Sequence, residues 1–183
     1  MDGNGRWARR RGHPASFGHR AGVRAIKRAL EGCEELGVRV LSVYAFSTEN
    51  WSRPRAEVRA LMRLFHETMQ REIDEMHRRG VRIVVSGRRD ELSRKMRERI
   101  DEAAIAGRLY VPELPDPDLI IRTAGERRVS NFLLWQSAYS EMLVTETLWP
   151  DFGIEDLKAA IADYSSRVRN FGGRPEDSAA AAQ

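Results

Sequence analysis

Helical and strand-like stretches alternate along this chain of 183 residues. Apolar residues at spacings of three and four predict one helix from His19 to Leu36 and another from Pro54 to Arg79. Runs rich in β-branched and aromatic residues predict buried strands from Val38 to Phe46 and from Val81 to Ser86. Because strands that alternate with helices usually pair in parallel, we expect an α/β fold with a mostly parallel central sheet flanked by helices.

The same alternation continues to the end of the chain. A weakly patterned helix is predicted from Glu91 to Ala106, and Leu119 to Ile121 is a short apolar run. A helix is predicted from Phe132 to Tyr139, a strand from Met142 to Thr145, and an amphipathic helix from Ile154 to Phe171. We therefore expect a single domain over 1–171, followed by a small, polar, flexible tail over 172–183.

Composition restricts the class of protein. Hydrophobic residues make up 42% and charged residues 32% of the sequence, which is typical of a soluble globular protein. No apolar run approaches the roughly 20 residues that span a bilayer, and the N-terminus does not resemble a signal peptide. The single cysteine, Cys33, excludes an internal disulfide and a cysteine metal cluster. These features predict a cytoplasmic protein.

The net charge is +4, carried mostly by arginine, whose rigid fork matches phosphate oxygens. For most of these residues an ordinary solvated surface explains the charge equally well. No helix-turn-helix, zinc finger or aromatic–basic repeat accompanies it, so we expect no nucleic-acid partner.

The segment Met1–Trp7 places the carboxylate of Asp2 beside Gly3, Gly5 and Arg6. A dinucleotide-binding loop is rejected because no strand precedes it, and a P-loop because its lysine and serine are missing. A turn of this kind can present backbone N–H groups to an anion, while the aspartate holds a divalent cation against it. The alternative is an ordinary glycine turn.

Two further segments combine polar and basic side chains. Ser47–Pro54 follows a predicted strand, where open α/β sheets bind ligands, and contains Glu49, Asn50 and Arg53; its residues also suit a plain turn. Arg122–Asn131 joins a strand end to a glycine turn, arginines and a serine. With the Asp2 segment, it suggests two phosphate-binding sites, for two phosphorylated substrates or one long anionic one.

The apolar stripe on the helix after Pro54 has two interpretations. It contains Val58, Leu61, Met62, Phe65, Met69, Ile73 and Met76. Such a stripe is usually core, but methionines also line pockets for flexible apolar ligands.

Together these segments resemble the cis-prenyltransferases, most closely the bacterial undecaprenyl diphosphate synthase type. The matching motifs are Met-Asp-Gly-Asn-Gly-Arg-Trp-Ala at 1–8, Phe-Gly-His at 17–19, the 47–54 loop, the 122–131 segment and Leu-Trp-Pro-Asp-Phe at 148–152. The resemblance implies a homodimer with an apolar tunnel. It also implies magnesium-dependent condensation of isopentenyl diphosphate with an allylic diphosphate such as farnesyl diphosphate, giving a cis-polyprenyl diphosphate.

The resemblance also implies roles for individual residues. Asp2 is similar to the catalytic aspartate that binds Mg²⁺, Asn50 to the residue assigned to proton removal, and Glu141 to a second magnesium ligand. The residues similar to substrate-binding positions are Gly3, Asn4, Gly5, Arg6, Trp7, His19, Ser47, Thr48, Glu49, Trp51, Arg53, Arg122, Arg128, Val129 and Ser130. Peripheral membrane association through the product, at the inner face of the membrane, is a further implication.

The chain departs from the family pattern in four places. It begins at Met1 without the family's first strand, and it lacks an internal strand–helix unit, so we expect a gap or an unusually open sheet near residues 105–108. Ala15 stands where a basic residue is usual, and Asn170-Phe171-Gly172 replaces an Arg-x-Gly motif. These departures favour an alternative: a catalytically impaired or non-catalytic homologue or partner subunit that binds prenyl diphosphates.

Overall fold

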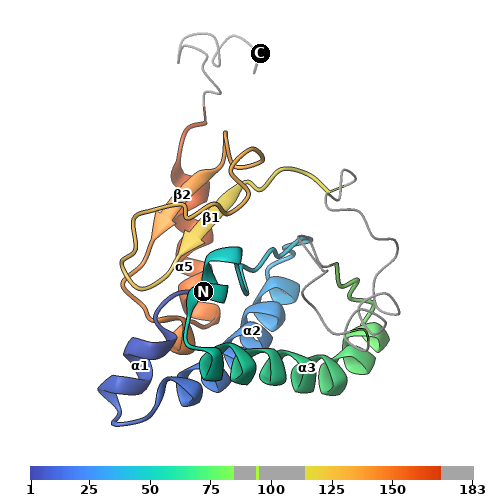
Figure 1. Cartoon of the computed structure of the whole chain (residues 1–183). Helices are drawn as coiled ribbons and strands as arrows, with labels where there is room; N and C mark the ends of the chain where they lie inside the picture. The colour runs from blue at the N-terminus through green and yellow to red at the C-terminus, as the bar shows by residue number, and fades with distance from the viewer. Residues whose placement is uncertain (85–93, 95–113, 170–183) are drawn as a thin grey trace, which may run out of the picture.

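A computed structural model of the chain describes residues 1–84, 94 and 114–169 (Figure 1). In chain order the elements are α1 (Asn4–Arg10), α2 (Ala15–Glu35), the 3₁₀ helix η1 (Thr48–Ser52), α3 (Arg55–Arg78), β1 (Leu119–Arg122), β2 (Glu141–Val144), the 3₁₀ helix η2 (Trp149–Asp151) and α5 (Ile154–Ser166). In Figure 1 the two strands stand above α2 and α3, and the N-terminus lies between them. No helix in the described ranges is long and apolar enough to cross a bilayer.

The strands β1 and β2 pair in parallel, in a register that runs from Leu119 opposite Glu141 to Arg122 opposite Val144. This confirms the expected α/β fold with a parallel sheet. The carboxyl ends of both strands therefore lie at one edge, and Glu141 lies at the other end of the ladder.

The N-terminal segment is fixed along the carboxyl edge of the sheet. Thr123, which follows β1 and is only 1% exposed, accepts a hydrogen bond from the Asp2 N–H and donates one to the Asp2 carbonyl, each 2.9 Å long. The Trp149 N–H donates to the same carbonyl over 2.9 Å. The backbone of Asp2 is thereby held beside the end of β1 by contacts from two distant parts of the sequence.

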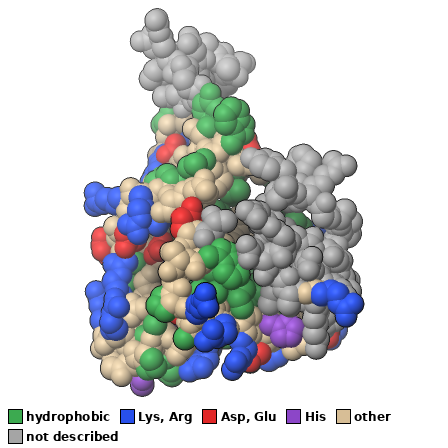
Figure 2. All heavy atoms as spheres, viewed as in Figure 1, with side chains coloured by type: hydrophobic (Ala, Val, Ile, Leu, Met, Phe, Trp, Pro, Cys, Tyr) green, Lys and Arg blue, Asp and Glu red, His purple; other side chains and the backbone are tan. Residues whose placement is uncertain are grey.

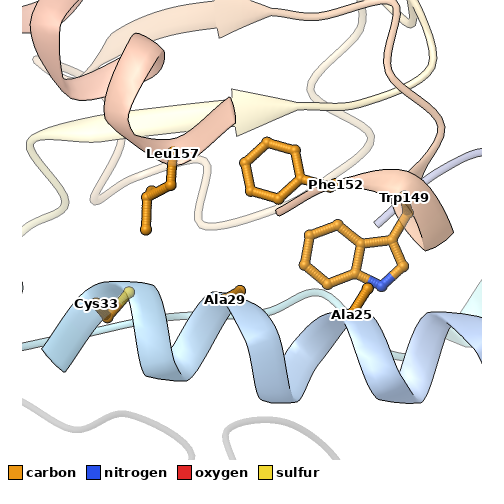
Figure 3. Packing of buried hydrophobic residues seen from close by; sticks show 6 residues of the cluster. All are labelled: Ala25, Ala29, Cys33, Trp149, Phe152 and Leu157. Atoms are coloured by element: carbon orange, nitrogen blue, oxygen red, sulfur yellow. The ribbon is translucent and has the colours of Figure 1, made fainter. Parts of the chain in front are cut away.

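The core lies between α2 and the η2–α5 segment (Figure 3). The small residues Ala25, Ala29 and Cys33 form the buried face of α2, and Trp149, Phe152 and Leu157 pack onto it. The Trp149 ring stacks on Phe152 with 5.5 Å between centroids, and its Nε1–H donates 2.9 Å to a backbone carbonyl of α2. Small residues on one helix thus allow large aromatic rings on its neighbour to be fully covered.

Helices α1 and α2 approach each other at two glycines of α2. A Cβ built on Gly18 would lie 2.0 Å from the Asn4 carbonyl oxygen, and one on Gly22 would lie 2.3 Å from Asn4 Oδ1. A side chain at either position would force the helices apart. This close approach determines where Asn4 and its neighbours lie.

The two long predicted helices are confirmed. The first is α2, which begins at Ala15 rather than His19, and the second is α3. The predicted strand at 142–145 is confirmed as β2, and the last helix ends at Ser166, where Arg167 turns to extended backbone, before the predicted end at 171.

Two predicted strands are wrong in the part that the structure describes. Residues 38–46 and 81–84 form no strand, and Val40, Leu41 and Val43 are exposed instead of buried. A strand exists only when a neighbouring strand completes its backbone hydrogen bonds, and no such neighbour is found among residues 1–84 and 114–169. The residue composition of these segments favours extended backbone, but it does not show whether a neighbouring strand is present to pair with them.

The predicted helix at 132–139 is also wrong, because this stretch consists of turns and bends. The residues Ser130, Asn131 and Leu133 have positive φ angles of 51°, 61° and 47°, which interrupt a right-handed helix at its start. The predicted helix at 91–106 (Arg94 apart), the gap near 105–108 and the tail at 172–183 lie outside the described residues.

Candidate functional site

A pocket of about 550 Å³ opens where the N-terminal segment, the 44–53 segment and the end of β1 meet. It is lined by Met1, Asp2, Gly3, Asn4, Gly5, His19, Tyr44, Ala45, Phe46, Ser47, Glu49, Asn50, Arg53, Leu61, Arg122, Arg128, Ser130 and Asn131. Figure 2 shows acidic side chains interspersed among Lys and Arg on the visible face, rather than one continuous basic surface. The lining residues come from all three sequence motifs, so these motifs, distant along the chain, meet in one cavity.

The centre of the pocket is the ion pair between Asp2 and Arg122. Arg122 Nε donates to Asp2 Oδ2 over 3.0 Å, with side-chain exposures of 11% for Arg122 and 39% for Asp2. The Nη1 of the same guanidinium donates to Ser130 Oγ over 3.2 Å and to the Arg128 carbonyl oxygen. One arginine at the end of β1 thus connects the carboxylate of the first motif to the loop of the third.

The opposite wall comes from η1 and the residues before it. The Ser47 N–H donates to Asn50 Oδ1 over 3.4 Å as part of a capping box, which orients the Asn50 amide. The Tyr44 hydroxyl donates 3.1 Å to the Ser130 carbonyl and so joins the two walls. The site is held together by polar contacts between segments that no single helix or strand contains.

A tight turn follows β1 and places Glu126. Ala124 and Gly125 both have positive φ, 69° and 70°, and their N–H groups donate to the Thr147 and Thr145 carbonyls over 2.9 Å. Glu126 then accepts from Arg6 over 2.6 Å and pairs with Arg128. Hydrogen bonding from Arg128 is the largest cause that lowers the pKa of Glu126, and Arg6 acts in the same direction.

Two polar atoms at the pocket are buried without a hydrogen-bond partner among the described residues: Asn4 Oδ1 and His19 Nε2. An unsatisfied buried polar atom costs about 1–3 kcal/mol, so it is usually explained by function, water or a ligand. Both atoms belong to residues that the sequence motifs had singled out.

Several predicted site residues do not line the pocket. Arg6 is bound to Glu126, and the indole N–H of Trp7 donates 2.6 Å to Asp151. Trp51 and Val129 are exposed, and the side chain of Thr48 lies outside what the structure describes.

Glu141 lies at the far end of the ladder, where its carboxylate accepts from Arg167 over 2.7 Å. Asp2 and Glu141 are therefore not brought together within one chain.

Sequence reasoning missed other residues that shape the site. Thr123 holds the Asp2 backbone, Tyr44 joins the walls, and Glu126 and Glu57 hold basic residues. Thr123 and Glu126 lie inside the 122–131 motif, and this position was the one sequence signal that could have identified them. Glu57 lies on the apolar-striped helix and gave no clue beyond an ordinary surface charge.

The donor set suits a magnesium ion that substrate phosphates help to hold. Asp2 presents a partly exposed carboxylate in the pocket, and Glu49 also lines it. Within residues 1–84 and 114–169, no group of three or more His, Cys, Asp or Glu side chains forms a closed metal cage. Magnesium is typically bound by one or two carboxylates together with phosphate oxygens and water, so the residues fit this ion.

Comparison with known proteins identifies relatives along nearly the whole chain. An isoprenyl transferase of Heliobacterium mobile is 43% identical over 94% of this chain and 85% of its own length. A ditrans,polycis-undecaprenyl-diphosphate synthase, (2E,6E)-farnesyl-diphosphate specific, of Xanthomonas axonopodis is 41% identical over 94% of this chain and 86% of its own length.

Among solved structures, lavandulyl diphosphate synthase of Lavandula x intermedia, in complex with dimethylallyl diphosphate, matches with a TM-score of 0.85 and 28% identity. That match covers 94% of this chain and 95% of the lavender chain.

The match also contains an internal discontinuity. The Heliobacterium alignment spans 221 positions although this chain has 183 residues, so that relative carries residues with no counterpart here. A family model described as "Putative undecaprenyl diphosphate synthase" matches residues 1–106 and 99–172, two stretches that overlap at 99–106, next to the place where the sequence predicted a missing unit. Since these stretches include all the pocket-lining segments, the chain belongs to this prenyltransferase family.

Proposed function

We propose that this chain condenses isopentenyl diphosphate with an allylic diphosphate of the farnesyl type and forms a cis-polyprenyl diphosphate. The observation that carries the proposal is the Asp2–Arg122–Ser130 network inside a pocket that Asn50 also lines. The names of the relatives indicate the type of reaction. In the proposed enzyme, the residues around Asp2 and those around Arg122 would each bind an anionic group. A volume of about 550 Å³ falls within the range usual for small-molecule sites.

The allylic diphosphate would lie against Asp2 and the Gly3–Gly5 backbone, and His19 and Arg53 also line the pocket. When its carbon–oxygen bond breaks, negative charge develops on the departing diphosphate. Preorganised cationic donors stabilise such charge because they need not reorient during the step. A magnesium ion held by Asp2 would supply further positive charge at the leaving group.

Isopentenyl diphosphate would bind Arg122, Arg128 and Ser130, which line the pocket next to Asp2. Asn50 lines the pocket, and its amide is oriented by the Ser47 N–H, which suits the proposed part in removing the proton from the new carbon chain. Leu61 is the member of the apolar stripe that reaches the pocket lining, so we propose that the growing chain leaves along α3.

Incorporation of radiolabelled isopentenyl diphosphate tests the reaction. The purified chain is incubated with farnesyl diphosphate, the labelled substrate and Mg²⁺, and the products are extracted and sized. Label should enter long products, and Asp2→Ala should abolish this. Glu155→Ala, which removes an 82% exposed glutamate of α5 outside the pocket, should leave incorporation unchanged. A folded protein that binds both diphosphates without incorporation would support the alternative of a non-catalytic homologue.

We further propose a homodimer. Trp135 is 86% exposed, and Leu134 and Tyr139 beside it are exposed as well, an apolar surface that a second copy would cover. Because Glu141 lies at the other end of the sheet from Asp2, a magnesium site shared by these two residues needs the Glu141 of a second copy. Sedimentation of the chain and of Trp135→Asp tests this proposal: a monomeric wild type contradicts it.

The product is a long apolar chain, so we also propose peripheral association with the cytoplasmic face of a membrane during turnover. Flotation with lipid vesicles, in the presence and absence of both substrates, checks it. Binding should require product formation, and equal binding without substrates would contradict the proposal.

A further inference from the structure

His19 has an unusual environment for a pocket histidine. Its side chain is 15% exposed, and its Nε2 is buried without a hydrogen-bond partner. The nearest acidic atom is Glu57 Oε1 in the first turn of α3, at 3.7 Å, which is too long for a hydrogen bond but short enough for an ion pair. The ring thus has one nitrogen next to a carboxylate, and the residue itself lines the pocket.

Glu57 is held in place from the other side. Its Oε1 accepts from Arg53 Nη1 over 3.2 Å, and Arg53 also lines the pocket. Glu57 lies in the first turn of α3, so its carboxylate is close to the partial positive charge of the helix N-terminus. The row Arg53–Glu57–His19 therefore alternates in charge as soon as the imidazole is protonated.

In the free protein the imidazole favours its neutral form. Burial is the largest cause that lowers the pKa of His19 from its ordinary value of 6.5; Glu57 opposes this and Arg53 adds to it. The other charged side chains that line the pocket are Asp2, Glu49, Arg122 and Arg128. A diphosphate entering this pocket brings a larger negative charge than any of them, and an adjacent anion stabilises an imidazolium.

We propose that Glu57 is a positioning residue for His19: as the allylic diphosphate binds, His19 takes up one proton from solvent and the imidazolium is held between Glu57 and the diphosphate. In the complex, Nε2–H moves closer to Glu57 than the 3.7 Å of the free protein and donates to it, while Nδ1–H donates to a diphosphate oxygen. No covalent bond breaks, because the proton comes from the buffer. The inference rests on the proposed function, since the anion is the allylic substrate.

The consequence is a gain of positive charge that occurs only when substrate is present. An uncharged histidine avoids the cost of a buried cation in the empty pocket, and the charged form binds the leaving group more strongly. Replacing Glu57 by glutamine keeps the shape and removes the anion that supports Nε2–H. The variant should bind the diphosphate with less proton uptake.

Calorimetry of farnesyl S-thiolodiphosphate, an unreactive analogue, with Mg²⁺ tests this directly. The binding enthalpy is measured near pH 7 in buffers of different ionisation enthalpy, and its slope gives the number of protons taken up. The analogue's own protonation contributes equally to all variants, so the comparison is between slopes. Wild type should take up about half a proton or more beyond the number that His19→Asn takes up on binding. Proton uptake by Glu57→Gln should be close to that of His19→Asn.

The matched control is Glu75→Gln, which removes a glutamate paired with Arg78 on the same helix but outside the pocket; its slope should equal that of wild type. Equal slopes in wild type and His19→Asn, or in wild type and Glu57→Gln with circular dichroism unchanged, would overturn the inference and leave the proposed function standing. Failure of wild type to bind the analogue would instead overturn both.

The pH dependence of binding gives a second readout that a purely structural role would not change. Affinity for the analogue should weaken as pH rises through the titration of His19 in the complex. In Glu57→Gln this weakening should begin at lower pH, by about one unit, because the imidazolium has lost its anionic partner. If the affinity of Glu57→Gln is lower at every pH but its pH dependence is not shifted, the positioning role is contradicted.

Discussion

Replacing Arg122 by lysine tests whether the guanidinium fork, rather than its charge, holds the two halves of the pocket together. The arginine makes three contacts: Nε to Asp2, and Nη1 to Ser130 Oγ and to the Arg128 carbonyl. A lysine ammonium placed near Asp2 keeps the ion pair, but it cannot reach across to the 128–130 loop in the same geometry. Arg122→Lys should therefore keep the ion pair with Asp2 and lose the hydrogen bonds to the 128–130 loop.

The loss can be estimated from the contacts. A hydrogen bond with a charged donor contributes about 1.5–3 kcal/mol, and we use the lower value because the site is open to solvent. Two lost hydrogen bonds then amount to about 3 kcal/mol, which corresponds to about a hundredfold lower kcat/KM. Most of this should appear with isopentenyl diphosphate, whose proposed site contains the 128–130 loop.

Steady-state incorporation of labelled isopentenyl diphosphate, with each substrate varied in turn, measures the effect. Arg79→Lys is the control, since Arg79 pairs with Glu34 at the end of α3 and does not line the pocket. It should stay within about twofold of wild type because an exposed pair contributes little. If Arg122→Lys keeps more than about a fifth of wild-type kcat/KM, the argument that the fork organises the pocket is refuted.

Three further predictions concern stability. Gly125→Ala should lower the urea midpoint by an amount equivalent to about 1–2 kcal/mol or more, because its φ is +70° and the new Cβ would lie 2.6 Å from a glutamate oxygen; an unchanged midpoint would contradict the turn geometry. Trp149→Phe should cost about 1–3 kcal/mol in the same assay, since a buried carbonyl loses its donor, and a cost below that range would show that the hydrogen bond is unimportant. The pKa of His19 is lowered in the folded state, so the unfolded chain binds the proton first as pH falls. The free energy of unfolding should therefore decrease as the pH is lowered below 6.5. His19→Asn should remove that part of the slope in urea titrations, and an identical slope would argue against a neutral buried imidazole.

How far the sequence predicted the fold depended on whether each element is determined locally. The helix α3 was predicted almost to its ends, because a 3.6-residue apolar period is contained in the segment itself. The strand expected at 38–46 failed because pairing depends on another segment. The helix expected at 132–139 failed because the positive φ angles around Asn131 are imposed by the loop that carries Ser130 to Arg122.

The candidate site shows the same division. Asp2, Asn50 and Arg122 were found because they lie in long, specific motifs, and the structure places all three at one pocket. Glu141 was named through the family resemblance alone, and the register of β1 and β2 puts it at the opposite end of the sheet from Asp2.

The two walls of the pocket are supported unequally, and this bears on the choice between an enzyme and a non-catalytic homologue. The wall with Asp2 and Arg122 is held by the β1–β2 ladder, by Thr123 and by the buried Trp149. The wall with Asn50 follows the 38–46 segment, which has no strand partner in the described part of the chain.

In the proposed reaction, the diphosphates would bind mainly to the first wall, whereas proton removal would depend on the second. Loss of the internal unit that relatives carry should therefore reduce kcat more than it weakens substrate binding. A chain that binds both diphosphates well and turns over slowly would follow from this asymmetry of support, without any change in the residues that perform the chemistry.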